Sequence, residues 1–108
     1  MASTYLSKTF SSAGNRTKWT WSAWVKRHSL GGYHYLFNAY TDNNNRTSIL
    51  TWDGDWFAVD DRSSGTSTNY LLTNRKLRDT LGFYHFVVSV DTSLSTADDR
   101  VKIYINGV

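Results

Sequence analysis

The 108-residue sequence contains no cysteine, proline, glutamate or glutamine. Without cysteine the chain has no disulfide framework and no metal site or nucleophile built on a thiolate. Strong helix formers are scarce, whereas 17 aromatic residues and many serines and threonines are present. This composition excludes a helical bundle and favours an all-β chain.

Long apolar runs are also missing, because no stretch approaches the roughly 20 residues that a membrane span needs. The N-terminus, Met1-Ala2-Ser3-Thr4, lacks the basic and apolar regions of a signal peptide. We therefore expect synthesis and folding in a cytoplasm, with no membrane insertion. The net charge is only +3, and its basic residues are spread along the chain. This pattern is typical of solvated strand faces and predicts no nucleic-acid partner.

The stretch from Phe83 to Asp91 is the most strand-like part of the chain. It is rich in valine and aromatic residues and follows Gly82. Because both of its faces carry apolar side chains, we predict a central strand that is covered on both faces, as in a sandwich.

Alternating or β-rich patterns predict further strands on either side of this segment. The predicted strands span residues 5–10, 17–27, 33–40, 47–52, 56–59, 70–73 and 100–105. Asp53-Gly54-Asp55 is a strong hairpin signal between two of them. Residues 60–69 are expected to form a polar loop, and residues 75–82 have room for one helical turn. We predict a single domain over residues 1–108.

Asn106-Gly107 is the commonest type I′ hairpin pair, and the sequence stops one residue later. A hairpin turn without a returning strand leaves an unpaired sheet edge. We therefore expect either the N-terminal part of a longer chain, the alternative we favour, or an edge that another chain covers. The expected subunit contacts are Val101, Ile103, Tyr104 and Ile105.

Four segments, taken in order, resemble the laminin-G-like, concanavalin-A-like jelly-roll family. They are Trp-Thr-Trp-Ser-Ala-Trp-Val-Lys at 19–26, Tyr-Leu-Phe at 35–37, residues 83–91, and Val-Lys-Ile-Tyr-Ile-Asn-Gly-Val at 101–108. The resemblance implies an antiparallel β-sandwich. The segments 11–16 and 91–101 look like the variant found in tail and surface proteins of tailed bacteriophages. Domains of this family usually continue past the Asn-Gly turn, so the resemblance also allows an incomplete sandwich.

The resemblance makes glycan hydrolysis the first enzymatic hypothesis, since hydrolases on this fold use two glutamates on one strand. This chain has none. Asp53 and Asp55 are expected to be solvated in their turn, and adjacent pairs such as Asp60-Asp61 point to opposite faces of a strand. His85 is expected to be a packed or hydrogen-bonded core residue, and no Gly-x-Ser-x-Gly elbow is present. We therefore predict no catalytic residues and no enzyme activity.

Some members of the resembled family hold calcium at the sandwich rim. Asp42, Asn43, Asp53 and Asp55 are the loop oxygens that could form such a site here. The alternative is that these residues only shape turns, which aspartate and asparagine favour without any ion. We expect no other metal site and no cofactor.

Carbohydrate binding needs an exposed aromatic ring with polar neighbours. The candidates are Trp24, which is out of phase with its strand, and Trp52 and Trp56, which flank the Asp-Gly turn. The alternative is that all five tryptophans pack in the core or against a subunit.

The favoured function is a non-enzymatic structural or adhesive module of a phage particle, in a fibre, tail or capsid surface. Its partners would be other virion subunits, as a homo-oligomer, and a host-surface glycan. The alternative is a carbohydrate-binding module of a secreted or cell-surface protein.

Overall fold

A computed structural model describes residues 4–108, so the first three residues of the predicted domain lie outside it. The described chain contains seven strands and one short 3-10 helix, which confirms the all-β class. The strands are β1 (Lys18–Lys26), β2 (His34–Asp42), β3 (Asn45–Thr51), β4 (Trp56–Ser63), β5 (Thr66–Lys76), β6 (Phe83–Asp91) and β7 (Val101–Ile105), and the helix is η1 (Ala97–Asp99). The chain divides into two compact units. One holds the sheet of β1, β6 and β7, and the other, Lys26–Phe83, holds the sheet of β2 to β5.

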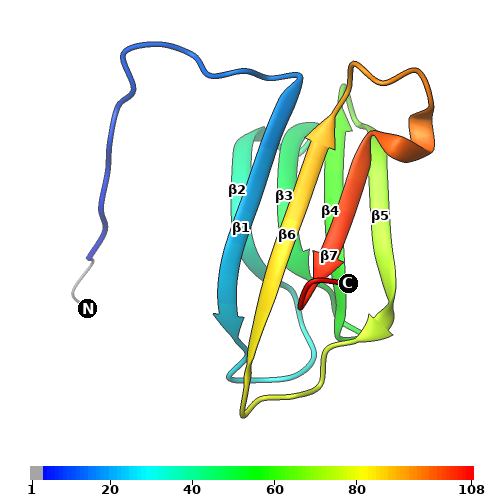
Figure 1. Ribbon diagram of the computed structural model, residues 1–108. Helices are drawn as coiled ribbons and strands as arrows, with labels where there is room; N and C mark the ends of the chain where they lie inside the picture. Colours follow the sequence, from blue (N-terminus) through cyan, green and yellow to red (C-terminus); the bar gives the residue numbers. More distant parts are fainter. Residues whose placement is uncertain (1–3) are drawn as a thin grey trace. The chain divides into compact units, whose positions relative to one another are not determined.

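In the three-stranded sheet, β6 lies between β1 and β7, as predicted for the central strand (Figure 1). Its side chains alternate, and Tyr84, Phe86, Val88 and Val90 are buried. The prediction that both faces are covered was wrong, because Phe83 is 61% exposed and Val87 only half-buried. An apolar strand face can stay exposed to solvent where it serves as an interaction surface.

The second unit is a meander in which each strand pairs antiparallel with its sequence neighbour (Figure 1). On one face of this sheet Ile49, Phe57 and Val59 are almost fully buried. The predicted Asp-Gly hairpin joins β3 to β4. Its turn is closed by a bond from the Asp55 N–H to the Trp52 carbonyl (2.9 Å), and Asp55 takes a positive φ of 69°.

The expected polar loop over residues 60–69 was wrong. Instead, β4 runs on to Ser63 and β5 starts at Thr66. Ser64 and Gly65 form the two-residue turn, with φ values of 51° and 81°. Two successive positive φ angles match the right-handed twist of the flanking strands, so a tight hairpin forms without a loop.

Two predictions for segments outside the observed strands were also wrong. Residues 5–10 form no strand, and Tyr5, Leu6 and Phe10 are exposed. Residues 77–82 form no helical turn, because the Asp79 carboxylate accepts the N–H groups of Leu81 and Gly82 and shapes a loop. No helix among the described residues is long and apolar enough to cross a membrane.

The predicted Asn106-Gly107 turn is present. Both residues have positive φ, 54° and 82°, and the N–H of Ile105 donates to the carbonyl of Val108 (3.0 Å). Within the described residues, β7 pairs only with β6.

Candidate binding site

A cavity of about 200 Å³ opens on one face of the four-stranded sheet. Its lining residues are Tyr33, Tyr35, Arg46, Ser48, Leu50, Trp52 and Asp60. Strand alternation explains this set, because Arg46, Ser48 and Leu50 are alternate residues of β3 and point to the same face. The register then places Tyr35 beside Leu50 and Asp60 beside Ser48. We call this site the Arg46 cavity.

Two charged side chains line the Arg46 cavity, Arg46 and Asp60, and a third, Arg62, lies beside it. Arg46 Nη2 donates to Asp60 Oδ2 at 3.1 Å, and Arg62 Nε lies 3.3 Å from the same oxygen. The Arg62 contact is ionic only, since that Nε makes no hydrogen bond in the described chain. The Asp60 side chain is 2% exposed, whereas the side chains of Arg46 and Arg62 are 18% and 36% exposed. One buried carboxylate therefore faces two guanidinium groups that still reach the surface.

The walls of the Arg46 cavity are aromatic. The Trp52 ring meets Tyr33 edge to face at 4.8 Å between centroids, and meets Tyr70 in the same way at 5.7 Å. Tyr33 and Tyr35 are each more than half exposed. Such edge-to-face pairs hold Trp52 in place and leave tyrosine rings at the mouth. Of the three tryptophans proposed from the sequence, Trp52 is the one that lines this cavity.

The other two tryptophans occupy different surroundings. The ring of Trp56 packs over the backbone of Gly54, where an added Cβ would lie 2.0 Å from it, and Lys76 Nζ lies 4.8 Å from its centroid. Trp24 belongs to the three-stranded sheet and is 68% exposed, as its position out of phase suggested. Its ring stacks on His85 at 4.6 Å.

His85 is half-buried on a sheet face, so the expectation of a core position was wrong, although its ring does form a hydrogen bond. Its Nε2 lies 3.2 Å from Ser22 Oγ. His28 and His34 form a tilted ring pair at 5.7 Å, and His34 also contacts Thr51 Oγ1 at 3.3 Å.

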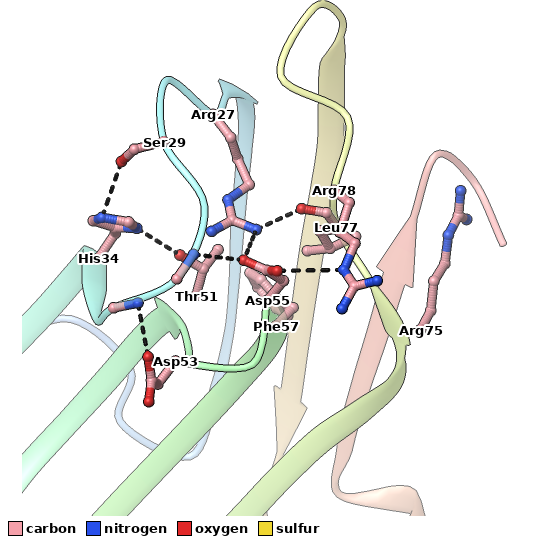
Figure 2. Close-up of polar contacts among 12 residues, drawn as sticks. Arg27, Ser29, His34, Thr51, Asp53, Asp55, Phe57, Arg75, Leu77 and Arg78 are labelled. Atoms are coloured by element: carbon pink, nitrogen blue, oxygen red, sulfur yellow. Dashed lines mark hydrogen bonds and ion pairs between the residues drawn. The ribbon is translucent and has the colours of Figure 1, made fainter.

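A second polar group, which we call the Asp55 cluster, joins Asp55 to Arg27, Gly31, Leu77 and Arg78 (Figure 2). Asp55 Oδ1 lies 3.0 Å from Arg27 Nη1 and accepts the Gly31 N–H at 2.8 Å. Arg27 also donates to the Leu77 carbonyl, and the Leu77 N–H donates to the Asp55 carbonyl at 2.7 Å. Arg78 Nε lies 3.5 Å from Asp55 Oδ2. The expectation that Asp55 is solvated was wrong, because its side chain is 11% exposed.

The Gly31 N–H bond and the Arg27 guanidinium lower the pKa of Asp55 from its ordinary value, against the opposing effect of burial. A carboxylate held ionised in this way accepts hydrogen bonds but is a poor proton donor. The cluster ties together three loop segments and is structural in character.

The structure does not bring the calcium candidates together. Asp42 and Asn43 lie just before β3, whereas Asp53 and Asp55 lie after its other end. The strand between them is about 20 Å long. Within residues 4–108 no group of three or more histidine, cysteine or acidic side chains could hold a metal ion.

These four residues instead shape turns or bind neighbouring groups of the chain. Asp42 accepts the Asn44 N–H at 2.7 Å, and its bond from the Asn45 side chain lowers its pKa. Asn43 Oδ1 accepts from the Tyr40 hydroxyl at 3.2 Å. Asp53 accepts the Gly32 N–H at 3.0 Å.

The proposed contact residues of β7 divide into two groups. Val101 and Ile105 are buried within this chain, so their side chains are not free for a partner. Ile103 is half-buried and Tyr104 is 41% exposed. A partner at this strand would therefore meet the backbone edge and the ring of Tyr104.

Sequence reasoning missed both arginine–aspartate groups. The available signal was Asp60-Asp61, whose side chains do point to opposite faces. Asp60 contacts Arg46, whereas Asp61 accepts from the hydroxyls of Thr47 and Thr68, each at 2.6 Å. An aspartate pair inside a β-rich stretch indicates that at least one carboxylate needs a buried partner.

Comparison with known proteins gives one family. The family model of the laminin G type, described as the concanavalin A-like lectin/glucanases superfamily, matches residues 2–108. Searches among curated proteins and among solved structures give no match. The two antiparallel sheets agree with the sandwich fold that the resemblance implied. The chain belongs to the concanavalin A-like lectin/glucanase superfamily.

Proposed function

We propose that this chain is a non-enzymatic structural or adhesive module of a bacteriophage particle, within a fibre, a tail or the capsid surface. It is assembled in the host cytoplasm and acts through contacts between its surfaces and other virion subunits. The resemblance of segments 11–16 and 91–101 to phage tail and surface proteins supports this assignment.

The observation that carries the proposal is an exposed apolar surface on the three-stranded sheet. Phe83, His85 and Val87 alternate along β6 and share a face. Trp24 stacks on His85, and Tyr104 lies directly opposite Val87. We call these five residues the aromatic face. Phe83, Trp24 and Tyr104 are 61%, 68% and 41% exposed, and contiguous exposed rings of this kind mark protein contacts.

Two properties support a non-enzymatic role. The sequence has no glutamate to supply the catalytic pair used on this fold. The pKa of the buried carboxyl group of Asp55 is lowered by the Gly31 N–H and by Arg27, whereas a glycosidase needs one carboxyl group with a raised pKa. We expect no hydrolysis of glucans, galactans or surface polysaccharide.

The edge of β7 provides a second contact for a homo-oligomer. Its outward backbone groups have no strand partner among residues 4–108, and such an edge accepts another strand. The proposed partner is another virion subunit, a second copy of this chain included.

Immunoblotting of purified particles tests the proposal. The wild-type chain should band with intact particles, and Trp24→Ser or Tyr104→Ser should lower its incorporation several-fold. Thr66→Ser, a change at the exposed first residue of β5, should leave incorporation unchanged. Absence of the chain from purified particles would contradict the assignment.

The Arg46 cavity favours a second candidate, a carbohydrate-binding module of a secreted or cell-surface protein. Its exposed aromatic walls and few polar groups fit a small-ligand site. A glycan array tests this candidate, with binding expected for the wild type and lost in Tyr35→Ser.

A further inference from the structure

The charged group at the Arg46 cavity, made of Asp60, Arg46 and Arg62, has one more positive than negative charge. Asp60 supplies one negative charge, and Arg46 and Arg62 supply two positive charges. The remaining Asp60 oxygen is 3.5 Å from Ser67 Oγ, which is neutral. These three side chains therefore sum to +1, with Arg46 and Asp60 lining the cavity and Arg62 lying beside it on the same Asp60 oxygen.

Arg46 also has unused hydrogen-bonding capacity. A guanidinium group offers five N–H donors in a planar fork, and Arg46 commits Nη2 to Asp60. Its Nε is buried without a hydrogen-bond partner in the described chain. Because this Nε is buried, a ligand would meet the part of the guanidinium group that reaches the surface, since the Arg46 side chain is 18% exposed. A planar guanidinium group matches a carboxylate better than a neutral hydroxyl group.

The size and walls of the cavity restrict what else the ligand contains. About 200 Å³ is smaller than the several hundred Å³ of a site for a drug-sized molecule, so one ring fills it. Trp52, Tyr33 and Tyr35 offer ring surfaces beside the charged side chains. A flat apolar wall next to a guanidinium group suits a ring with one apolar face and one anionic substituent.

We propose that the Arg46 cavity binds a single acidic sugar, a pyranose ring bearing a carboxylate, with the carboxylate on Arg46 and the ring against Trp52, Tyr33 and Tyr35. This inference rests on the second candidate function above and names its ligand class. A ligand with one negative charge balances the site, whereas a doubly charged phosphate adds repulsion from Asp60.

Trp52 reports on the site, so titration of the wild-type chain with glucuronic acid should change tryptophan fluorescence, with saturation in the millimolar range expected for one ring. The same titration with glucose tests the contribution of the sugar ring to binding, and titrations with acetate and inorganic phosphate test the contribution of the negative charge. We expect glucuronic acid to bind at least tenfold more tightly than each of these three.

Matched variants locate the contact. Arg46→Met should weaken binding of glucuronic acid at least tenfold, and Tyr35→Ser, which alters an exposed ring, should weaken it without unfolding the chain. Arg75→Met, the same change at an exposed arginine of β5, should leave binding unchanged. A urea unfolding curve for each variant shows that the fold is kept.

The remaining outcomes are distinguishable. Equal binding of glucose and glucuronic acid would overturn the acidic-sugar inference while supporting carbohydrate binding. Equal binding of acetate, or tighter binding of phosphate, would reduce the site to a general anion site and overturn the inference. Failure of all four probes, together with an empty glycan array, would overturn both the inference and the second candidate function.

Discussion

Asp55 and Asp60 are two buried carboxylates of the same unit, and each faces two arginines, yet their surroundings differ. The principal partner of Asp55 is Arg27, whose side chain is 3% exposed, and the pair also binds backbone groups of neighbouring loops. The partners of Asp60 are two arginines that reach solvent beside an open cavity. The first arrangement fixes loops, and the second leaves charge available to a ligand.

The comparison predicts the largest effect for Asp55→Ala. The change removes the carboxylate from buried Arg27 and from the Gly31 N–H, so the free energy of unfolding should fall by about 3 kcal/mol. Urea unfolding measures it. Asp53→Ala, which loses one exposed bond to Gly32, is the control and should cost about 1 kcal/mol or less. Equal losses of unfolding free energy in the two variants would show that the buried contacts of Asp55 add no more stability than the exposed bond of Asp53.

Asp60→Asn should have a smaller effect, about 1–2 kcal/mol, because both arginines that it leaves can be hydrated at the cavity mouth. The asparagine keeps the shape of the side chain, so the loss reports the charge. Urea unfolding again measures it. A loss as large as that of Asp55→Ala would mean that Arg46 and Arg62 are as enclosed as Arg27.

The pH dependence of stability tests the ionised state of Asp55. The pKa of Asp55 is lowered in the folded chain, so its stabilising contribution is present above its unfolded pKa of about 3.9 and is lost as the pH falls through the folded value. The stability difference between the wild type and Asp55→Asn should be constant near neutral pH and shrink below about pH 4. Unfolding curves at several pH values measure it, and a difference that grows on acidification would contradict the assignment.

Arg78→Gln should have the smallest effect. Its side chain is 62% exposed and lies 3.5 Å from Asp55, so the loss should stay below about 1 kcal/mol. Arg27→Gln, the same change at the buried partner, should cost several times more. Similar losses of unfolding free energy in Arg78→Gln and Arg27→Gln would show that the charge of these arginines, and not their burial, determines what they contribute to stability.

The parts of the fold that could be predicted have local causes. The valine-rich run of β6 and the Asp-Gly and Asn-Gly turns each act within a few residues. The hairpin at Ser64-Gly65 was missed because the strands beside it carry polar side chains that look like a loop. Residues 5–10 have strand-forming side chains but no strand partner in the described chain, so the strand predicted from their pattern does not form.

The candidate site was predictable only in part. Trp52 stood out because of its place beside a turn, but Arg46 meets Asp60 only through the register of β3 on β4. Arg27 and Asp55 are 28 positions apart, and only the path of the backbone joins them. Pairings of this kind depend on tertiary structure, which a single sequence does not specify locally.

The connectivity of the two sheets has a consequence for folding kinetics. The contacts of β2 to β5 are between consecutive strands, whereas Ser22 of β1 meets His85 of β6 across 63 positions. Closing so long a loop costs more chain entropy and slows folding. We expect the amide groups of the meander to gain protection from hydrogen exchange first during refolding. Docking of β1 on β6 would then be the late step, and its speed would set the time for which the apolar residues of β6 stay open to aggregation.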